Sequence, residues 1–185
     1  HRGAYLMAMG TAVGWQMVHY PKYLSVVPMF HCNGWGHPWM MPIVGGTTVF
    51  TRNPAPDRII KAFIEEKITH FGGAPIILQM LADSPDKPAE PFDPPVNAFT
   101  AGAPPPAAIL EKMGSMGLNV EQVYGLAETY GHITQCLFQD EWAALGSAEQ
   151  AERQAFQGIA MPMVEEARVI DRETGKDVPR DGQTQ

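Results

Sequence analysis

The sequence predicts an α/β fold with a mostly parallel sheet and helices on both of its faces. Apolar, β-branched segments alternate with amphipathic helical segments along the chain, which is typical of a parallel sheet. Glycine and proline are frequent, at 18 and 17 of 185 residues, and many of them stand at the strand-to-helix turns that such a fold needs. Apolar residues make up 45% of the chain, so we expect one subdomain with its own core over residues 1–185.

The N-terminal quarter is expected to hold a helix, a strand and a second helix. Residues 3–19 carry few charges and predict a helix. Four apolar residues recur at helical spacing and predict its buried stripe: Leu6, Met9, Val13 and Met17. A proline ends this helix, residues 23–28 form a strand, and an apolar helix through residues 39–41 ends at a glycine pair.

The middle of the chain alternates strands and helices. We expect strands over residues 47–51 and 68–71, with an amphipathic helix over 56–67 between them. Its inward residues are expected to be Ile59, Ile60, Phe63 and Ile64. Pro75 suits the start of the next helix, where no N–H is needed, and residues 84–95 form a surface loop rich in proline and aspartate.

The C-terminal half continues this alternation. We expect a strand over residues 98–101, a helix over 105–117, and an apolar strand over 118–124 that Gly125 ends. The remaining expected elements are a strand over 133–138, a polar surface helix over 142–157, a turn over 158–162, and a strand over 165–171 that leads into a hairpin turn at 174–175.

A turn rich in functional groups follows the strand over residues 118–124. Tyr124 can stack on a base, Gly125 lets the backbone approach a phosphate, and Glu128 can hold Mg²⁺ beside the hydroxyl of Thr129. In open α/β sheets, ligands bind at this end of the strands. Taken alone, this string is as compatible with a plain strand that ends in a polar turn.

Two further clusters allow a functional and a structural interpretation. His31, Cys32 and His37 match no zinc spacing and form no second cluster, so a metal site is not predicted there. His31 either lines a pocket at the end of its strand or is a structural histidine at a helix start. Residues 72–74 are small, so they form either a plain turn or a place where the backbone lies close to a ligand.

Four strings resemble the adenylate-forming (AMP-binding) superfamily, in its acyl-CoA ligase branch: VPMFHCNGW (27–35), THFGGAP (69–75), TAGAPP (100–105) and QVYGLAET (122–129). The resemblance covers essentially the whole chain and implies one subdomain of an acyl-CoA synthetase-like fold. It implies that a carboxylate attacks the α-phosphate of ATP and that coenzyme A then takes the acyl group. The implied cofactors and co-substrates are ATP, Mg²⁺ and coenzyme A, with a medium- or long-chain carboxylic acid as the substrate.

The resemblance also implies roles for single residues. Glu128, Thr129 and His31 are the implied catalytic residues, and Glu128 is the implied ligand of Mg²⁺. The nucleotide side comprises Gly102, Ala103, Pro104, Tyr124, Gly125 and Ala127. The acyl side comprises His31, Trp35, Gly72, Gly73 and Gly125.

The sequence departs from the family pattern in two ways. The family usually has threonine before the glutamate, whereas this chain has Ala127, which cannot donate a hydrogen bond to a phosphate. The phosphate loop, the ribose motif and the C-terminal lid with its lysine are absent from residues 1–185, and the chain begins at His1. We therefore expect a piece of a longer protein that is catalytically silent alone and that self-associates through uncovered apolar surface.

Composition limits the partners. A net charge of −7 and a pI of about 5.3 argue against nucleic acid as a main partner. Two cysteines form no disulfide framework, which favours a cytoplasmic location, and no apolar run is long enough to span a membrane. Small molecules are therefore the expected partners. Alternatives to the acyl-CoA ligase are an adenylation domain with another acceptor, a luciferase-type oxygenase, and a non-catalytic scaffold of the same fold.

Overall fold

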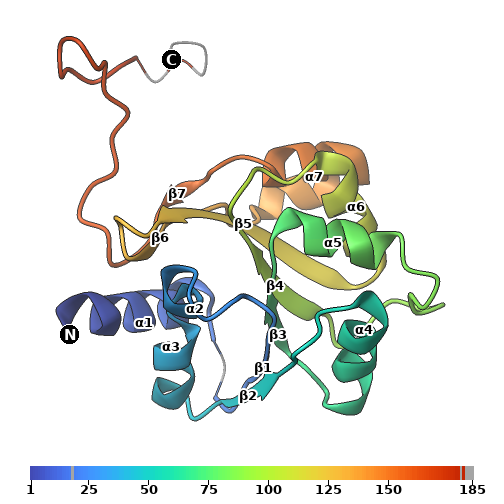
Figure 1. Cartoon of the computed structure of the whole chain (residues 1–185). Helices are drawn as coiled ribbons and strands as arrows, with labels where there is room; N and C mark the ends of the chain where they lie inside the picture. Colours follow the sequence, from blue (N-terminus) through green and yellow to red (C-terminus); the bar gives the residue numbers. More distant parts are fainter. Residues whose placement is uncertain (18, 180, 182–185) are drawn as a thin grey trace.

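The computed structural model describes residues 1–17, 19–179 and 181, and in this part of the chain a seven-stranded sheet lies between two layers of helices (Figure 1). The strand order is β2-β1-β3-β4-β5-β6-β7. All pairs from β2 to β5 are parallel, whereas β6 and β7 are antiparallel to their neighbours. The predicted α/β class with a mostly parallel sheet and helices on both faces is confirmed.

The elements lie close to the predicted ranges. The strands are β1 (Lys22–Ser25), β2 (Thr47–Phe50), β3 (His70–Gly72), β4 (Val96–Thr100), β5 (Leu118–Leu126), β6 (Gly131–Gln135) and β7 (Ile159–Ala160). The helices are α1 (Arg2–Gly14), α2 (Cys32–Trp35), α3 (His37–Ile43), α4 (Pro56–Glu65), α5 (Pro75–Ala82), α6 (Ala107–Ser115), the 3₁₀ helix η1 (Asp140–Ala144) and α7 (Ser147–Gln154).

Helices α4 to α7 cover one face of the sheet, and the larger core lies beneath them (Figure 1). On α4, the predicted residues Ile59, Ile60 and Phe63 are buried. Ile64 was also predicted to face inward, but it is 60% exposed. It follows Phe63 by about 100° around the helix, which turns it past the edge of the buried stripe.

Helices α1 and α3 cover the other face, where an aromatic core lies against β1, β3, β4 and β6. The ring of Trp15 stacks on Phe99 with centroids 3.8 Å apart. Met40 and Met41 of α3 are almost completely buried. None of the helices in the described part of the chain combines the length and apolar character needed to cross a membrane.

The stripe predicted to be buried on α1 is wrong. Leu6, Met9 and Val13 are exposed by 38%, 37% and 60%, and Met17 lies beyond the end of the helix. The buried residues are instead Met7, Ala8, Gly10, Thr11 and Gly14. Because apolar residues surround the whole helix, spacing alone could not select the face, and the small residues let α1 approach the sheet closely. A Cβ atom on Gly10 would clash with Met163.

The predicted end of the strand at Gly125 is also wrong, because β5 continues to Leu126 and turns back into β6. Gly125 pairs with His132, and the register shifts between Tyr124 and Gly125. A Cβ atom on Gly125 would clash with the carbonyl oxygen of Gly131. Gly125 is thus required because β6 approaches it closely. Sequence reasoning had predicted a phosphate at this place instead.

The C-terminal part is less regular than predicted. The expected helix over residues 142–157 is divided into η1 and α7, and β7 lies within the expected turn. The strand expected over residues 165–171 is reduced to an isolated bridge between Ile170 and Asp177, although Gly175 does form the expected turn. In Figure 1 this segment runs out from the sheet beyond β7.

Candidate active site

A cavity of about 1120 Å³ lies at the ends of β4 and β5. One wall is the turn after β4, the floor is formed by β5 and β6, and the opposite wall comes from β7 and the C-terminal segment. Its lining residues fall in the ranges 102–104, 122–126, 133–134, 157–160, 167–169 and 177–179. The cavity therefore lies where open α/β sheets bind their ligands.

Five of the residues predicted to bind a nucleotide line this cavity together: Gly102, Ala103, Pro104, Tyr124 and Gly125. Tyr124 is 42% exposed. Gly102 has a φ of 95°, which disfavours other residues, and nothing lies within 4 Å of the place where its Cβ would be. The backbone at Gly102 and the ring of Tyr124 thus leave open walls for a flat ligand. Ala127, the sixth predicted residue, does not line the cavity.

The floor of the cavity holds two polar groups that sequence reasoning missed. Gln122 and Thr134 line the cavity, and their side-chain oxygens are buried and have no hydrogen-bond partner among the described residues. Gln122 lies two residues before Tyr124 on the same strand, so the two side chains share a face. That alternation is the signal that could have revealed Gln122.

The turn between β5 and β6 is fastened by Thr129. Its hydroxyl accepts a hydrogen bond from the N–H of Leu126 at 2.8 Å and lies 3.0 Å and 2.8 Å from the carbonyl oxygens of Leu126 and Gly131. The N–H of Tyr130 donates to the carbonyl of Ala127. In this structure, the hydroxyl of Thr129 is therefore engaged within the turn and shapes the backbone that presents Glu128.

The carboxylate of Glu128 is exposed on this turn, and within the described part of the chain it makes no hydrogen bond or ion pair. It lies close enough to Cys32 to influence that thiol: burial, and then the negative charge of Glu128, raise the pKa of Cys32. The turn after β5 and the loop after β1 therefore meet in space, although 96 residues separate them in the sequence.

The described residues contain no group of three or more histidine, cysteine or acidic side chains that could hold a metal ion. A lone carboxylate such as Glu128 fits Mg²⁺ that arrives with a nucleotide, because this ion keeps most of its ligands as water and phosphate oxygens.

Of the residues predicted for the acyl side, Gly125 lines the cavity, whereas the other four lie outside it as a second group: His31, Trp35, Gly72 and Gly73. Trp35 is buried, and a Cβ atom on Gly72 would lie 3.3 Å from its ring and 2.8 Å from the hydroxyl of Tyr23. The N–H of Gly73 donates to the carbonyl of Phe99 at 3.0 Å. Trp35 and Gly72 are thus brought together, whereas His31 is exposed and its ring lies beside that of Phe30.

Three buried histidines lie beneath this second group, and sequence reasoning did not predict them as a cluster. The ring centroids of His37 and His132 are 6.0 Å apart, and the rings of His37 and His70 both contact Trp15. Burial lowers the pKa of His70 and of His132 to about 4. The pKa of His37 is lowered well below its usual range, by burial first and then by His132 and His70. All three are therefore neutral at pH 7.

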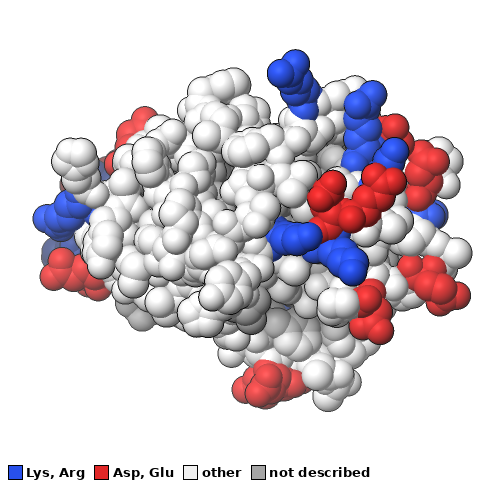
Figure 2. Space-filling view, turned by 90° about the horizontal axis from the view of Figure 1, so that it is seen from below, with Lys and Arg blue, Asp and Glu red and all other residues white. Residues whose placement is uncertain are grey.

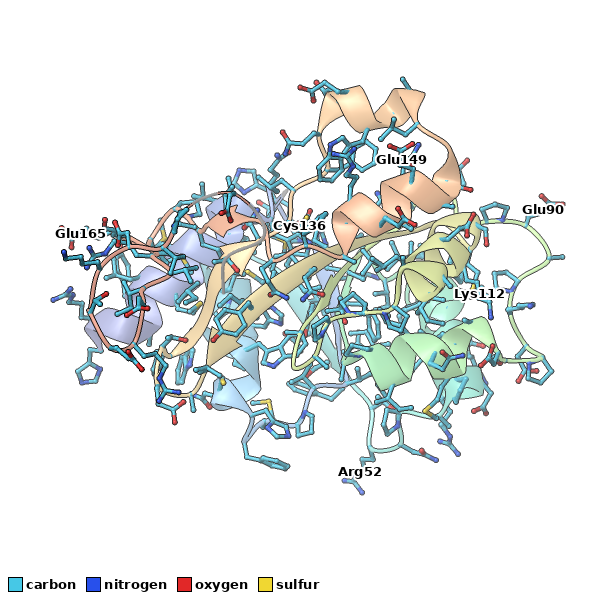
Figure 3. All side chains as sticks on the ribbon, turned by 90° about the horizontal axis from the view of Figure 1, so that it is seen from above. Arg52, Glu90, Lys112, Cys136, Glu149 and Glu165 are labelled. Carbon is cyan, nitrogen blue, oxygen red and sulfur yellow. The ribbon has the colours of Figure 1, made fainter. Side chains whose placement is uncertain are left out.

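Glu121 of β5 is a second unusual titratable group. Burial raises the pKa of its carboxyl to about 7, and one of its oxygens has no partner among the described residues. Nearby Cys136 donates to the carbonyl of Arg153 and packs against α7 (Figure 3). Burial, and then the charge of Glu121, raise the pKa of that thiol. Neither Glu121 nor Cys136 is among the lining residues of the cavity, which favours a structural role.

Comparison with known proteins gives three relevant similarities. The family model "AMP-binding enzyme" matches residues 1–184. Acetate/butyrate–CoA ligase AAE7 of Arabidopsis thaliana is 40% identical to this chain over 185 residues, and a benzoate–CoA ligase of the same plant is 39% identical over 184 residues. Each alignment covers 100% of this chain and 32% of the relative. The O-succinylbenzoate coenzyme A synthetase of Bacillus subtilis, solved with ATP and magnesium, has a TM-score of 0.77 at 19% identity, over 96% of this chain and 34% of its own.

These similarities correct the expected location and show how much of its relatives the chain covers. The predicted cytoplasmic location is contradicted, because both Arabidopsis relatives are named as peroxisomal. The low cysteine count on which it rested indicates only that there is no disulfide framework. The chain spans about a third of the length of these relatives, so the activity of a whole protein cannot be assigned to these residues alone.

Proposed function

The chain belongs to the family of AMP-binding enzymes, and from this we propose that it is the central part of an ATP-dependent acyl-CoA ligase. Such an enzyme joins a carboxylic acid to the α-phosphate of ATP and then transfers the acyl group to coenzyme A. The observation that carries the proposal is the cavity in which Gly102, Ala103, Pro104, Tyr124 and Gly125 meet. The similarity to named CoA ligases supports the choice of acceptor.

The cavity suits the adenine of ATP. The ring of Tyr124 stacks on the base, while the open backbone at Gly102–Pro104 borders its edge. Gln122 and Thr134 add polar side chains to the floor of the cavity beside Tyr124.

Glu128 is proposed to bind the Mg²⁺ that accompanies ATP. Attack of a carboxylate on a triphosphate brings two anions together, and Mg²⁺ there offsets their repulsion. The exposed turn leaves Glu128 free to do this. Ala127 supplies no hydroxyl, and Thr129 already uses its own within the turn. We therefore propose that backbone N–H groups of this turn, with water, act as donors to the phosphate.

The acid is proposed to bind between His31, Trp35 and the glycines 72 and 73. A medium- or long-chain acid was expected from the sequence, and that expectation stays untested. The relatives are named for acetate, butyrate and benzoate, and the ring of Trp35 lies against Gly72. Both observations support a small acid, which we adopt as the proposed substrate class.

Isolated residues 1–185 are proposed to be inactive. They contain no lysine-bearing phosphate loop and no lid of the kind that the family resemblance implies. The full-length protein is therefore the object to test. Detectable turnover of ATP by the 185-residue chain would contradict this part of the proposal.

The proposal is tested by acid-dependent exchange of labelled pyrophosphate into ATP, measured on the full-length protein with acids from acetate to palmitate and with benzoate. We expect exchange with small acids, and AMP release that further depends on coenzyme A. Exchange without stimulation by coenzyme A would favour another acceptor. No exchange by a folded protein with any acid would contradict the proposal and favour a scaffold.

A further inference from the structure

The five residues Cys32, Asn33, Gly34, Trp35 and Gly36 form a turn whose backbone is left-handed throughout. Their φ angles are 41°, 53°, 64°, 57° and 74°. Three of them are not glycine, although residues with a Cβ rarely adopt this conformation and seldom in succession. Several consecutive left-handed residues persist only where surrounding contacts hold them, and such segments concentrate at functional sites.

The contacts that hold this turn converge on Trp35. Its N–H donates to the carbonyl of His31 at 3.2 Å. Its ring lies against Gly72 at the end of β3 and meets the ring of His132 edge-on, with centroids 5.5 Å apart. At the end of the turn, a Cβ atom on Gly36 would lie 2.8 Å from Met7 of α1. The turn is thus fixed between α1, β3 and β6.

We propose that this left-handed turn sets the depth of the acid pocket by holding the indole of Trp35 against Gly72, with Asn33 as a positioning residue. The proposal rests on the function proposed above, in which Trp35 borders the acid. The direction of a side chain follows its own backbone. A return of the turn to right-handed φ values would therefore move the indole away from Gly72 and lengthen the pocket. Held as observed, the indole restricts the pocket to small acids.

Asn33 is a suitable residue for the test because its side chain is exposed and makes no hydrogen bond in the described part of the chain. Asparagine tolerates left-handed backbone better than most residues, whereas a β-branched residue does not. Asn33→Val therefore opposes the turn without removing a contact, and Asn33→Gly preserves it. Asn53 is also exposed but lies outside the left-handed region, so Asn53→Val is the matched control.

The experiment measures acid-dependent pyrophosphate exchange in the full-length protein. Asn33→Val is expected to lower kcat/KM for the best small acid by about 10- to 100-fold, as for a misplaced pocket wall. The KM for ATP should stay within about two-fold, since the nucleotide cavity is separate. The ratio of kcat/KM for a longer acid to that for the small acid should rise. Asn33→Gly and Asn53→Val should retain the rates of the unchanged protein.

Trp35→Leu shows whether Asn33 acts through the indole. If it does, Trp35→Leu shifts selectivity toward longer acids, and Asn33→Val has no further effect on selectivity in the Trp35→Leu protein. If Asn33→Val does not fold, Asn33→Ala is measured instead, with a smaller shift in the same direction.

The outcomes separate the two proposals. No exchange by the unchanged protein would overturn the proposed function and this inference with it. The unchanged protein could catalyse exchange while Asn33→Val or Asn33→Ala prefers acids in the same order as the control. That result would overturn only this inference. Equal effects of Asn33→Val with and without Trp35 would also overturn it.

Discussion

Burial of the Glu121 carboxyl raises its pKa and so makes the stability of the fold depend on pH. Sequence reasoning placed Glu121 on a strand, and the strand is present, but no pattern in the sequence indicates that one of its oxygens is buried without a partner among the described residues. That burial depends on how distant parts of the chain pack around β5. This is why the positions of single residues on a strand were predictable here, whereas their pKa values were not.

Glu121→Gln is expected to stabilise the fold above pH 7. The pKa of the carboxyl is raised from 4.5 to about 7 in the folded protein, so its contribution to stability is complete below pH 4.5 and is lost as the pH rises through 7. The glutamine side chain has no charge to bury at pH 8, which should raise the free energy of unfolding by about 1–3 kcal/mol. Urea denaturation at pH 8 and pH 5 measures the difference.

At pH 5 Glu121 is protonated in the folded protein and resembles a glutamine, so the gain in stability from Glu121→Gln should be much smaller than at pH 8. A gain of the same size at both pH values would show that the charge of Glu121 is not the cause. Exposed Glu90, which Figure 3 shows at the outer edge of the molecule, is the matched control, since Glu90→Gln should leave both values unchanged.

The turn between β5 and β6 is the element that presents Glu128, and Thr129 fastens it. Thr129→Val keeps the shape of the side chain but removes its hydrogen bonds to Leu126 and Gly131. We expect a loss of about 1–2 kcal/mol in the free energy of unfolding of the 185-residue chain, measured by urea denaturation. Thr129→Ser retains the hydroxyl and should retain most of the stability. Equal stability of the Val and Ser proteins would contradict the fastening role.

The buried face of a helix was predictable where the pattern of polar and apolar residues allowed only one face to be buried. Helix α4 has a polar and an apolar face, so three of its four predicted inward residues are indeed buried. Helix α1 is apolar on all sides, and its buried face was predicted wrongly. The turn at Cys32–Gly36 has no signal beyond its two glycines, because its handedness is determined by contacts with α1, β3 and β6.

The meeting of the predicted nucleotide-side residues in one cavity was predictable for the same reason, and their roles stay a prediction. The motifs place Gly102–Pro104 and Tyr124 at neighbouring strand ends, and the structure brings them into one cavity. The opposite wall, with Arg168 and Asp177, lies in a segment where a strand was predicted and only an isolated bridge is formed, so the sequence did not place this wall. Trp35, which was predicted for the acyl side, lies outside the cavity because it packs on the face of the sheet that α1 and α3 cover.

For the whole molecule, we expect stability to fall as the pH drops below about 6.5. His37, His70 and His132 have lowered pKa values in the folded protein, so the unfolded chain binds more protons between about pH 6.5 and pH 4. His37→Phe replaces a buried ring whose two nitrogens are unpaired within the described residues. It should make the acid-induced loss shallower in urea denaturation, whereas His19→Gln at an exposed position should not. An unchanged slope in His37→Phe would contradict this account.

The isolated 185-residue chain is expected to self-associate through the side of α1 that the structure leaves exposed. Figure 2 shows a broad surface without charged side chains between charged groups at its two ends. Val13 on α1 and Ile64 on α4 are both 60% exposed. In light scattering at high concentration, Val13→Lys should shift the chain toward the monomer, and Ile64→Lys should do so less. A monomer without any substitution would contradict the expectation.

The most direct test of the central claim compares acid-dependent pyrophosphate exchange in the full-length protein before and after Glu128→Gln, with Glu90→Gln as the control. The claim is that the turn after β5 supports adenylate formation through the carboxylate of Glu128. We expect Glu128→Gln to lower the exchange rate by at least about 100-fold, with unchanged thermal stability and with Glu90→Gln fully active. Full exchange by Glu128→Gln would contradict the assignment of the active site.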